Sequence, residues 1–289
     1  MWKRIFTIPL VLIMVLSFTA CTNGTGEAEE RAASPSAQEI VSYAVDSLDD
    51  IKTSQFEMNM TMAMAGEAEG ETFEATMVMD FNGTLDLENG RMGMDITMNV
   101  ATPGEDKIEM AVATYLLDDF VYMMMDLPEV GPMWMKLEMP EVAWEEMNQV
   151  ESQIGLLEAS QVKIIGSETI DGIDCYVLQL TPDMEQLWQV VMQQAEVAGE
   201  EIVDIPGEFL EEVFRSSSVK QWIAKDTYFL TKAQIDMVAE LTPEALGSPQ
   251  EEGLVTMEIA LDLLFYNYNQ SVSIVLPPEA VEAIEVPIQ

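Results

Sequence analysis

Apolar and polar residues alternate along most of the chain, which is the pattern of β-strands with one buried face. The first such run places Phe56, Met58, Met60, Met62 and Met64 on one side. Further runs cover 73–81 with a continuation to Leu87, 92–100, 108–112, 120–125 and 133–137. Turn signals separate them, of which Asn89-Gly90 is the strongest. The pattern predicts consecutive hairpins and therefore an antiparallel meander.

Helical spacing appears at four other places. Ser36 to Glu39 forms a capping box, and the apolar stripe that follows predicts an N-terminal helix. Further helices are predicted from Pro140, from Pro182 with the stripe Met184 to Ala195, and after Pro206 with Phe209 to Phe214. A hairpin over 162–180 and long strands over 219–224, 229–241 and 254–267 complete the pattern.

We predict the α+β class for this chain, because one helix and a long run of strands precede a helical interruption and more strands. The expected architecture is one large curved antiparallel sheet, a half-barrel of about 11 strands. An N-terminal helix leads into it, and further helices cover its concave face. Residues 36–289 are expected to form a single domain.

The N-terminus predicts export. Lys3 and Arg4 precede an apolar stretch that ends at Phe18-Thr19-Ala20-Cys21, so residues 1–20 have the layout of a lipoprotein signal peptide with Cys21 as the lipidated residue. A plain signal peptide and an uncleaved membrane anchor are the alternatives, although the apolar stretch is shorter than the roughly twenty residues that span a bilayer. Residues 21–35 are small, polar and acidic, which predicts a flexible tether. The expected location is the extracytoplasmic face of the bacterial cell membrane, or the outer membrane in a cell that has one.

The charge restricts the partners of this protein. There are 52 acidic and 12 basic residues, for a net charge of −40. Nucleic-acid binding depends on Lys and Arg contacts with phosphates, so a nucleic-acid partner is not expected. Anionic membrane surfaces also attract basic and not acidic segments, so we expect a diacylglyceryl group on Cys21 to hold the protein at the membrane.

Catalytic and metal motifs are missing from the sequence. It has no histidine, which excludes the Ser-His-Asp triad and the His-Glu-x-x-His zinc site. We therefore expect no enzyme activity, no cofactor and no metal site. The second cysteine, Cys175, has no partner once Cys21 is acylated and is expected to be a small buried side chain.

Methionine is unusually frequent, with 23 residues concentrated on one side of the predicted strands. Methionine packs adaptably, so such a face could be ordinary core or could line a deformable apolar cavity for acyl chains. Copper(I) binding by thioethers is a remote third interpretation. The residues expected to line the cavity are Met58, Met60, Met62, Met77, Met79, Met94, Met98 and Met110. Which face of the sheet is concave does not follow from the pattern.

Three stretches resemble the LolA/LppX/LprG-type lipoprotein superfamily. They are the helix-to-strand entry from Ala37 to Phe56, the hairpin around Ile170 to Leu180, and Val219 to Tyr228 with Leu230-Thr-Lys232. The resemblance spans about Ser36 to Leu276, and its motifs are structural. It implies a curved half-barrel that binds lipids or acyl chains in its cavity. The alternative is an envelope sensor or interaction module on the same fold, which implies an extracytoplasmic protein partner.

Overall fold

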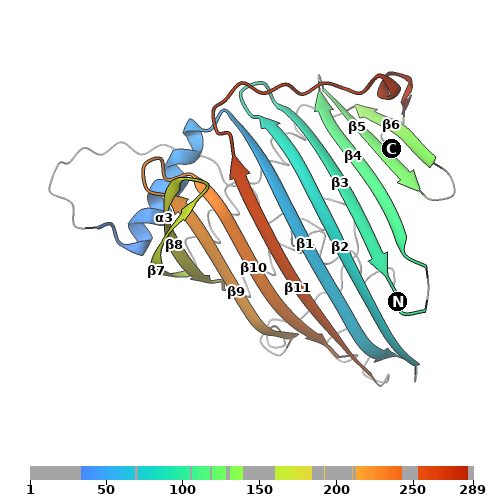
Figure 1. Ribbon diagram of the computed structural model, residues 1–289, viewed down its shortest axis with the longest axis horizontal. Coiled ribbons are helices and arrows are strands. Elements are labelled where there is room, and N and C mark those ends of the chain that lie inside the picture. Colours follow the sequence, from blue (N-terminus) through green and yellow to red (C-terminus); the bar gives the residue numbers. More distant parts are fainter. Residues whose placement is uncertain are drawn as a thin grey trace.

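A single curved sheet of 12 strands forms the body of the protein in this computed structural model (Figure 1). The structure describes residues 34–68, 71–104, 106–117, 119–127, 131–138, 160–183, 192, 210, 213–242 and 253–285. The strands of the first part of the chain are β1 (Thr53–Ala68), β2 (Glu71–Asp86), β3 (Arg91–Ala101), β4 (Ile108–Leu117), β5 (Phe120–Leu127) and β6 (Gly131–Glu138). The later strands are β7 (Gln161–Ile170), β8 (Ile173–Thr181), β9 (Phe214–Ala224), β10 (Leu230–Leu241), β11 (Gly253–Tyr266) and β12 (Ile284–Glu285).

The sheet consists of two meanders that meet in its middle. Its strand order is β12-β6-β5-β4-β3-β2-β1-β11-β10-β9-β8-β7, so β1 pairs with the late strand β11 along 14 residues from Gln55 to Ala68. All pairs are antiparallel except β12 with β6. The strands β6 and β7, which are consecutive in the chain, therefore lie near opposite ends of the strand order.

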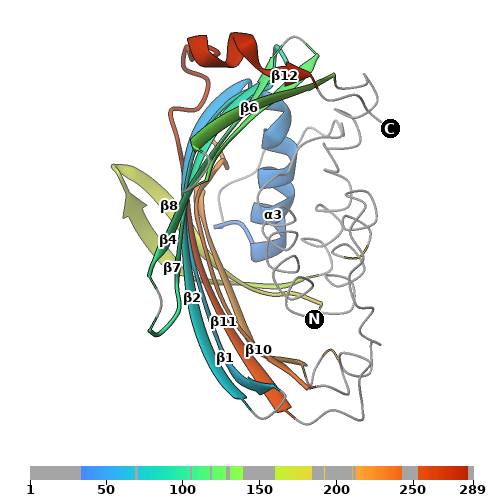
Figure 2. The same ribbon diagram turned by 90° about the vertical axis from the view of Figure 1, so that its right-hand side faces the viewer.

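The helix α3 (Ala37–Asp46) lies on the concave side of the sheet (Figure 2). Its start has the predicted capping box: the Glu39 amide donates to Ser36 Oγ over 3.3 Å, and the Ser36 amide donates to Glu39 Oε2 over 2.8 Å. The Ser36 amide and the Ser36 hydroxyl both donate to the Glu39 carboxylate and hold the pKa of this carboxyl below its ordinary value. Ile40 and Val41 are buried in the same apolar cluster as the methionines of β1 and β2.

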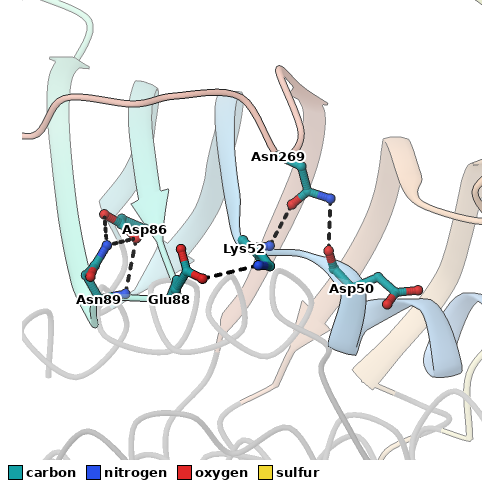
Figure 3. A network of polar contacts seen from close by, with 6 residues as sticks. All are labelled: Asp50, Lys52, Asp86, Glu88, Asn89 and Asn269. Atoms are coloured by element: carbon teal, nitrogen blue, oxygen red, sulfur yellow. Dashed lines mark hydrogen bonds and ion pairs between the residues drawn. The ribbon is translucent and has the colours of Figure 1, made fainter.

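A polar network fixes the entry of the chain into the sheet (Figure 3). The 3₁₀ helix η1 (Ser47–Asp50) follows α3, and Asn269 bridges its end to β1. The Asn269 side chain accepts a hydrogen bond from the Lys52 amide at 2.7 Å and donates to the Asp50 carbonyl at 2.9 Å. The Lys52 ammonium pairs with Glu88 at 3.2 Å. These contacts connect the helix to both β1 and the turn after β2.

The C-terminal segment runs from β11 to the far edge of the sheet. It contains the 3₁₀ helix η2 (Pro278–Glu282) and ends in β12, which pairs in parallel with Met135 and Lys136 of β6. Lys136 also forms an ion pair with Glu285 at 3.2 Å. This cover matters because an open strand edge can pair with other chains.

The predicted fold class is confirmed: the sheet is curved, open and almost wholly antiparallel, and a helix precedes it. The sheet has 12 strands where about 11 were predicted, because β12 pairs with a distant strand and has only two residues. Phe214, predicted at the end of a helix, is the first residue of β9. The predicted helices over the concave face lie outside the described residues, apart from single positions such as Met192 and Leu210. No helix within the described part of the chain is long and apolar enough to span a membrane.

Candidate functional site: the inner face of the sheet

The concave side of the sheet, called the inner face here, carries no charged side chain over most of its width. It is the side of Met60 and α3, and the strand register identifies its residues on every neighbouring strand. On β1, β3 to β6, β10 and β11, and on β2 from Phe73 onward, every inner-face residue lacks a charge. The outer face of the same strands is polar, with residues such as Glu57, Asp80 and Asp262. The concave side of these strands therefore presents uncharged and mainly apolar side chains.

Methionine is the main component of this face. Of the 17 methionines in the strands, 16 lie on the inner face and only Met124 lies on the outer face. The inner-face methionines are Met58, Met60, Met62, Met64, Met77, Met79, Met92, Met94, Met98, Met110, Met123, Met125, Met133, Met135, Met237 and Met257. One row across the sheet joins Met60, Met79, Met98 and Met110 on four consecutive strands.

The part of the inner face on β10, β11, β1 and β2 is tightly packed, and we call it the sealed half. Met60 is 0% and Met79 1% exposed, and almost all their inner-face neighbours on these four strands are buried. Close packing extends to the backbone. Gly83 lies under the ring of Phe56, and a Cβ at Gly83 would be only 2.1 Å from Phe56 Cε1. This half is a hydrophobic core in the ordinary sense.

The part on β3 to β6, which we call the wing, is covered much less. Inner-face residues of β3, β5 and β6 whose burial is described are half-buried, including Met98 and Met123. On β4, Ile108 is 46% exposed, while Leu116 is buried. The wing carries the same residue types as the sealed half but leaves them partly accessible. An apolar ligand could therefore contact the wing without displacing the core.

The eight predicted lining residues fall on both sides of this division. Met58, Met60, Met62, Met77 and Met79 are buried in the sealed half, whereas Met94, Met98 and Met110 lie half-buried in the wing. All eight share one face, as the alternation predicted.

Five further wing methionines were not among the predicted residues. They are Met92 of β3 and Met123, Met125, Met133 and Met135, the last four of which pair across β5 and β6. In the run Met123-Met124-Met125 both faces are apolar, so alternation does not distinguish inner from outer residues. The spacing of Met133 and Met135 was a signal for one shared face.

The outer face of the wing is aromatic. The rings of Tyr115 and Trp134 are 6.1 Å apart, and the Lys136 ammonium lies 4.8 Å from the centre of the Phe120 ring. Burial, together with the nearby Asp95 carboxylate, raises the pKa of Tyr115. Ile274 of the C-terminal segment packs on this side, 3.1 Å from the Cβ position of Gly93. The outer face of the wing therefore combines aromatic rings with polar residues such as Asp95 and Lys136, and it receives cover from the C-terminal segment.

Cys175 has no accessible chemistry in this structure. It is fully buried against Val177 and Trp222, as predicted, and its Sγ lies 3.6 Å from Thr231 Oγ1. Burial raises the pKa of this thiol, which disfavours the reactive thiolate. Within the described ranges, no group of three or more Cys, Asp or Glu side chains is placed to hold a metal ion.

The fold and this face define an open antiparallel half-barrel with an uncharged, methionine-rich concave side. The chain belongs to a family of unknown function (DUF6612), whose model matches residues 36–285. A comparison with curated protein sequences gives no significant match.

The chain also has a low similarity to several solved structures. The lipoprotein LppX of Mycobacterium tuberculosis is 12% identical with a TM-score of 0.37, and the match covers 83% of this chain and 100% of LppX. LprF of Mycobacterium bovis is 14% identical with a TM-score of 0.41, covering 84% and 98%. An outer membrane lipoprotein-sorting domain of Vibrio parahaemolyticus is 10% identical with a TM-score of 0.19, covering 75% and 87%. Likeness of this degree identifies neither a superfamily nor a ligand for this chain.

Proposed function

We propose that this protein is a non-enzymatic lipoprotein that binds lipid acyl chains against the wing of its inner face. The observation that carries the proposal is the half-buried methionine surface of β3 to β6, which adjoins a sealed core of the same composition. A folded protein normally buries such a surface or uses it for binding. Methionine suits a ligand of variable shape, because its unbranched side chain repacks easily.

Desolvation supplies the binding energy in this proposal. Each methylene group removed from water contributes about 0.8 kcal/mol, so an acyl chain gains affinity without any polar contact. The uncharged inner face fits this requirement, since a charged group beside an acyl chain would have to lose water without compensation. We further propose that residues 1–20 are removed and that a diacylglyceryl group on Cys21 holds the protein at the extracytoplasmic membrane face. The tether then keeps the wing close to the lipids that it exchanges.

Three consecutive methionines of β5 provide a test. Met123 and Met125 lie on the inner face, and Met124 between them lies on the outer face. We expect the double variant Met123→Gln and Met125→Gln to weaken binding of a fluorescent fatty acid at least about tenfold. The reason is that polar amides would replace two apolar side chains that contact the acyl chain. Met124→Gln is the control and should leave the affinity unchanged. Glutamine resembles methionine in size, so both variants should remain folded by circular dichroism.

The companion measurement is native mass spectrometry of the full chain purified from membranes, which should recover bound lipid. Recovery of only empty protein, together with no uptake of the fluorescent fatty acid, contradicts the proposal. If the inner-face variant loses the fatty acid but supports normal envelope function in cells, a sensor or interaction role replaces lipid binding. Crosslinking in cells would then identify the extracytoplasmic partner.

A further inference from the structure

We infer that the lipid bound at the wing has a headgroup without net negative charge. This inference rests on the proposed function and specifies the class of ligand. Its basis is the distribution of charge around the wing, which offers no cation to balance a headgroup of net negative charge. An anionic headgroup is normally held by Arg or Lys side chains or by free backbone N–H groups. The wing presents neither at its inner face.

The basic residues near the wing point elsewhere or are occupied. Lys136 lies on the outer face, next to the Phe120 ring and paired with Glu285 at 3.2 Å. Arg91 begins β3 on the outer-face register, opposite Asp86. Lys107 is exposed between Asp106 and Glu109. None of these cations is available to the inner face.

Carboxylates dominate the surroundings instead. Residues 91–138 contain nine acidic and three basic side chains, and the whole chain carries −40. At physiological salt, charges interact over about 8 Å, so the local excess of carboxylates matters more than the total. An anionic headgroup at the wing would find no cation among the described inner-face residues and would meet a segment of net negative charge. A lipid without net charge would not be repelled.

Thr114 is the single hydrogen-bonding side chain on the inner face of the wing. It is half-buried and stands between Met94 of β3 and Met123 of β5 in the strand register. A hydroxyl can donate to an ester carbonyl or accept from a lipid hydroxyl. Uncharged acyl esters therefore match both the apolar surface and its one polar group.

The experiment offers the full chain three lipids with identical oleoyl chains in mixed vesicles. They are dioleoylglycerol, zwitterionic dioleoylphosphatidylcholine and anionic dioleoylphosphatidylglycerol, and the lipids recovered with the repurified protein are quantified by mass spectrometry. We expect each neutral lipid to be bound at least about tenfold over the anionic one at low salt. The preference should shrink at high salt, because screening weakens the repulsion.

Thr114→Lys adds a cation to the inner face and should raise the share of phosphatidylglycerol at least about fivefold. Thr97→Lys is the matched control, since Thr97 is exposed on the outer face of β3 and adds the same charge. Equal uptake of all three lipids by the natural chain overturns the inference and leaves the proposed function standing. An equal share of phosphatidylglycerol bound by the two lysine variants also overturns the inference and leaves the proposed function standing. Uptake of none of the lipids overturns the proposed function itself.

Discussion

Met60 and Met98 lie on the same row of the sheet, two strands apart, and yet only Met60 is fully buried. The sealed half that contains Met60 packs against α3 and against Leu210 and Val213. Met98 and the other inner-face residues of β3 pack only at the margin of that cluster. Identical residue types on one continuous face thus serve as core in one half and remain accessible in the other. What covers a residue, and not its type, separates the buried core methionines from the accessible ones.

The largest expected effect comes from placing a carboxylate in each half. Met79 and Met98 are direct cross-strand partners. Met79→Asp should lower the free energy of unfolding by at least about 3 to 5 kcal/mol, because an unpaired charge would be buried. Met98→Asp should cost less than half as much, since its carboxylate can reach water. Urea unfolding of both variants measures the difference, and equal losses would show that the wing is sealed as well.

A smaller difference is expected when side chains are shortened on the same row. Met60→Ala should lower the free energy of unfolding by about 2 to 5 kcal/mol, as is usual for a fully buried methionine. Met110→Ala should cost about 1 kcal/mol or less, because Met110 is only half-buried. Thermal or urea unfolding checks both values. If Met110→Ala is as costly as Met60→Ala, the division between the two halves is wrong.

The packing of the sealed half can also be tested by adding a methyl group. Gly83→Ala should cost about 1 to 3 kcal/mol, because the new Cβ would overlap the Phe56 ring. Gly166→Ala is the control, since nothing lies within 4 Å of its Cβ position. The control should change stability by no more than about 0.5 kcal/mol. A tolerated Gly83→Ala would mean that Phe56 moves freely, which a sealed core does not allow.

The smallest effect concerns the helix that covers the sealed half. The folded-state pKa of Glu39 is depressed, so its contribution to stability is present above the unfolded pKa and is lost as the pH falls through the folded value. Glu39→Gln should therefore lower the unfolding midpoint slightly at pH 7. The difference should shrink below about pH 4.5, the ordinary value for this carboxyl. A difference that stays constant down to pH 3 would contradict the capping-box assignment.

Local patterns predicted most of the elements. Period-two alternation identified β1 to β3 and their shared face, and the Ser36–Glu39 box marked the start of α3 within one residue. Alternation did not distinguish inner from outer residues where both faces are apolar, as in Met123-Met124-Met125 of β5, although the strand itself was predicted. It also failed at β12, because two residues carry no recognisable period and form a strand only by pairing with β6.

The sequence by itself determined which residues form strands and which side chains share a face, because side-chain direction in a strand depends only on the neighbouring backbone. Only the tertiary structure decided that β1 lies beside β11, that the methionine face is the concave one, and that its two halves differ in cover. Those properties depend on residues far apart in the chain, such as Met60 with Leu261. A local pattern contains no information about such distant partners.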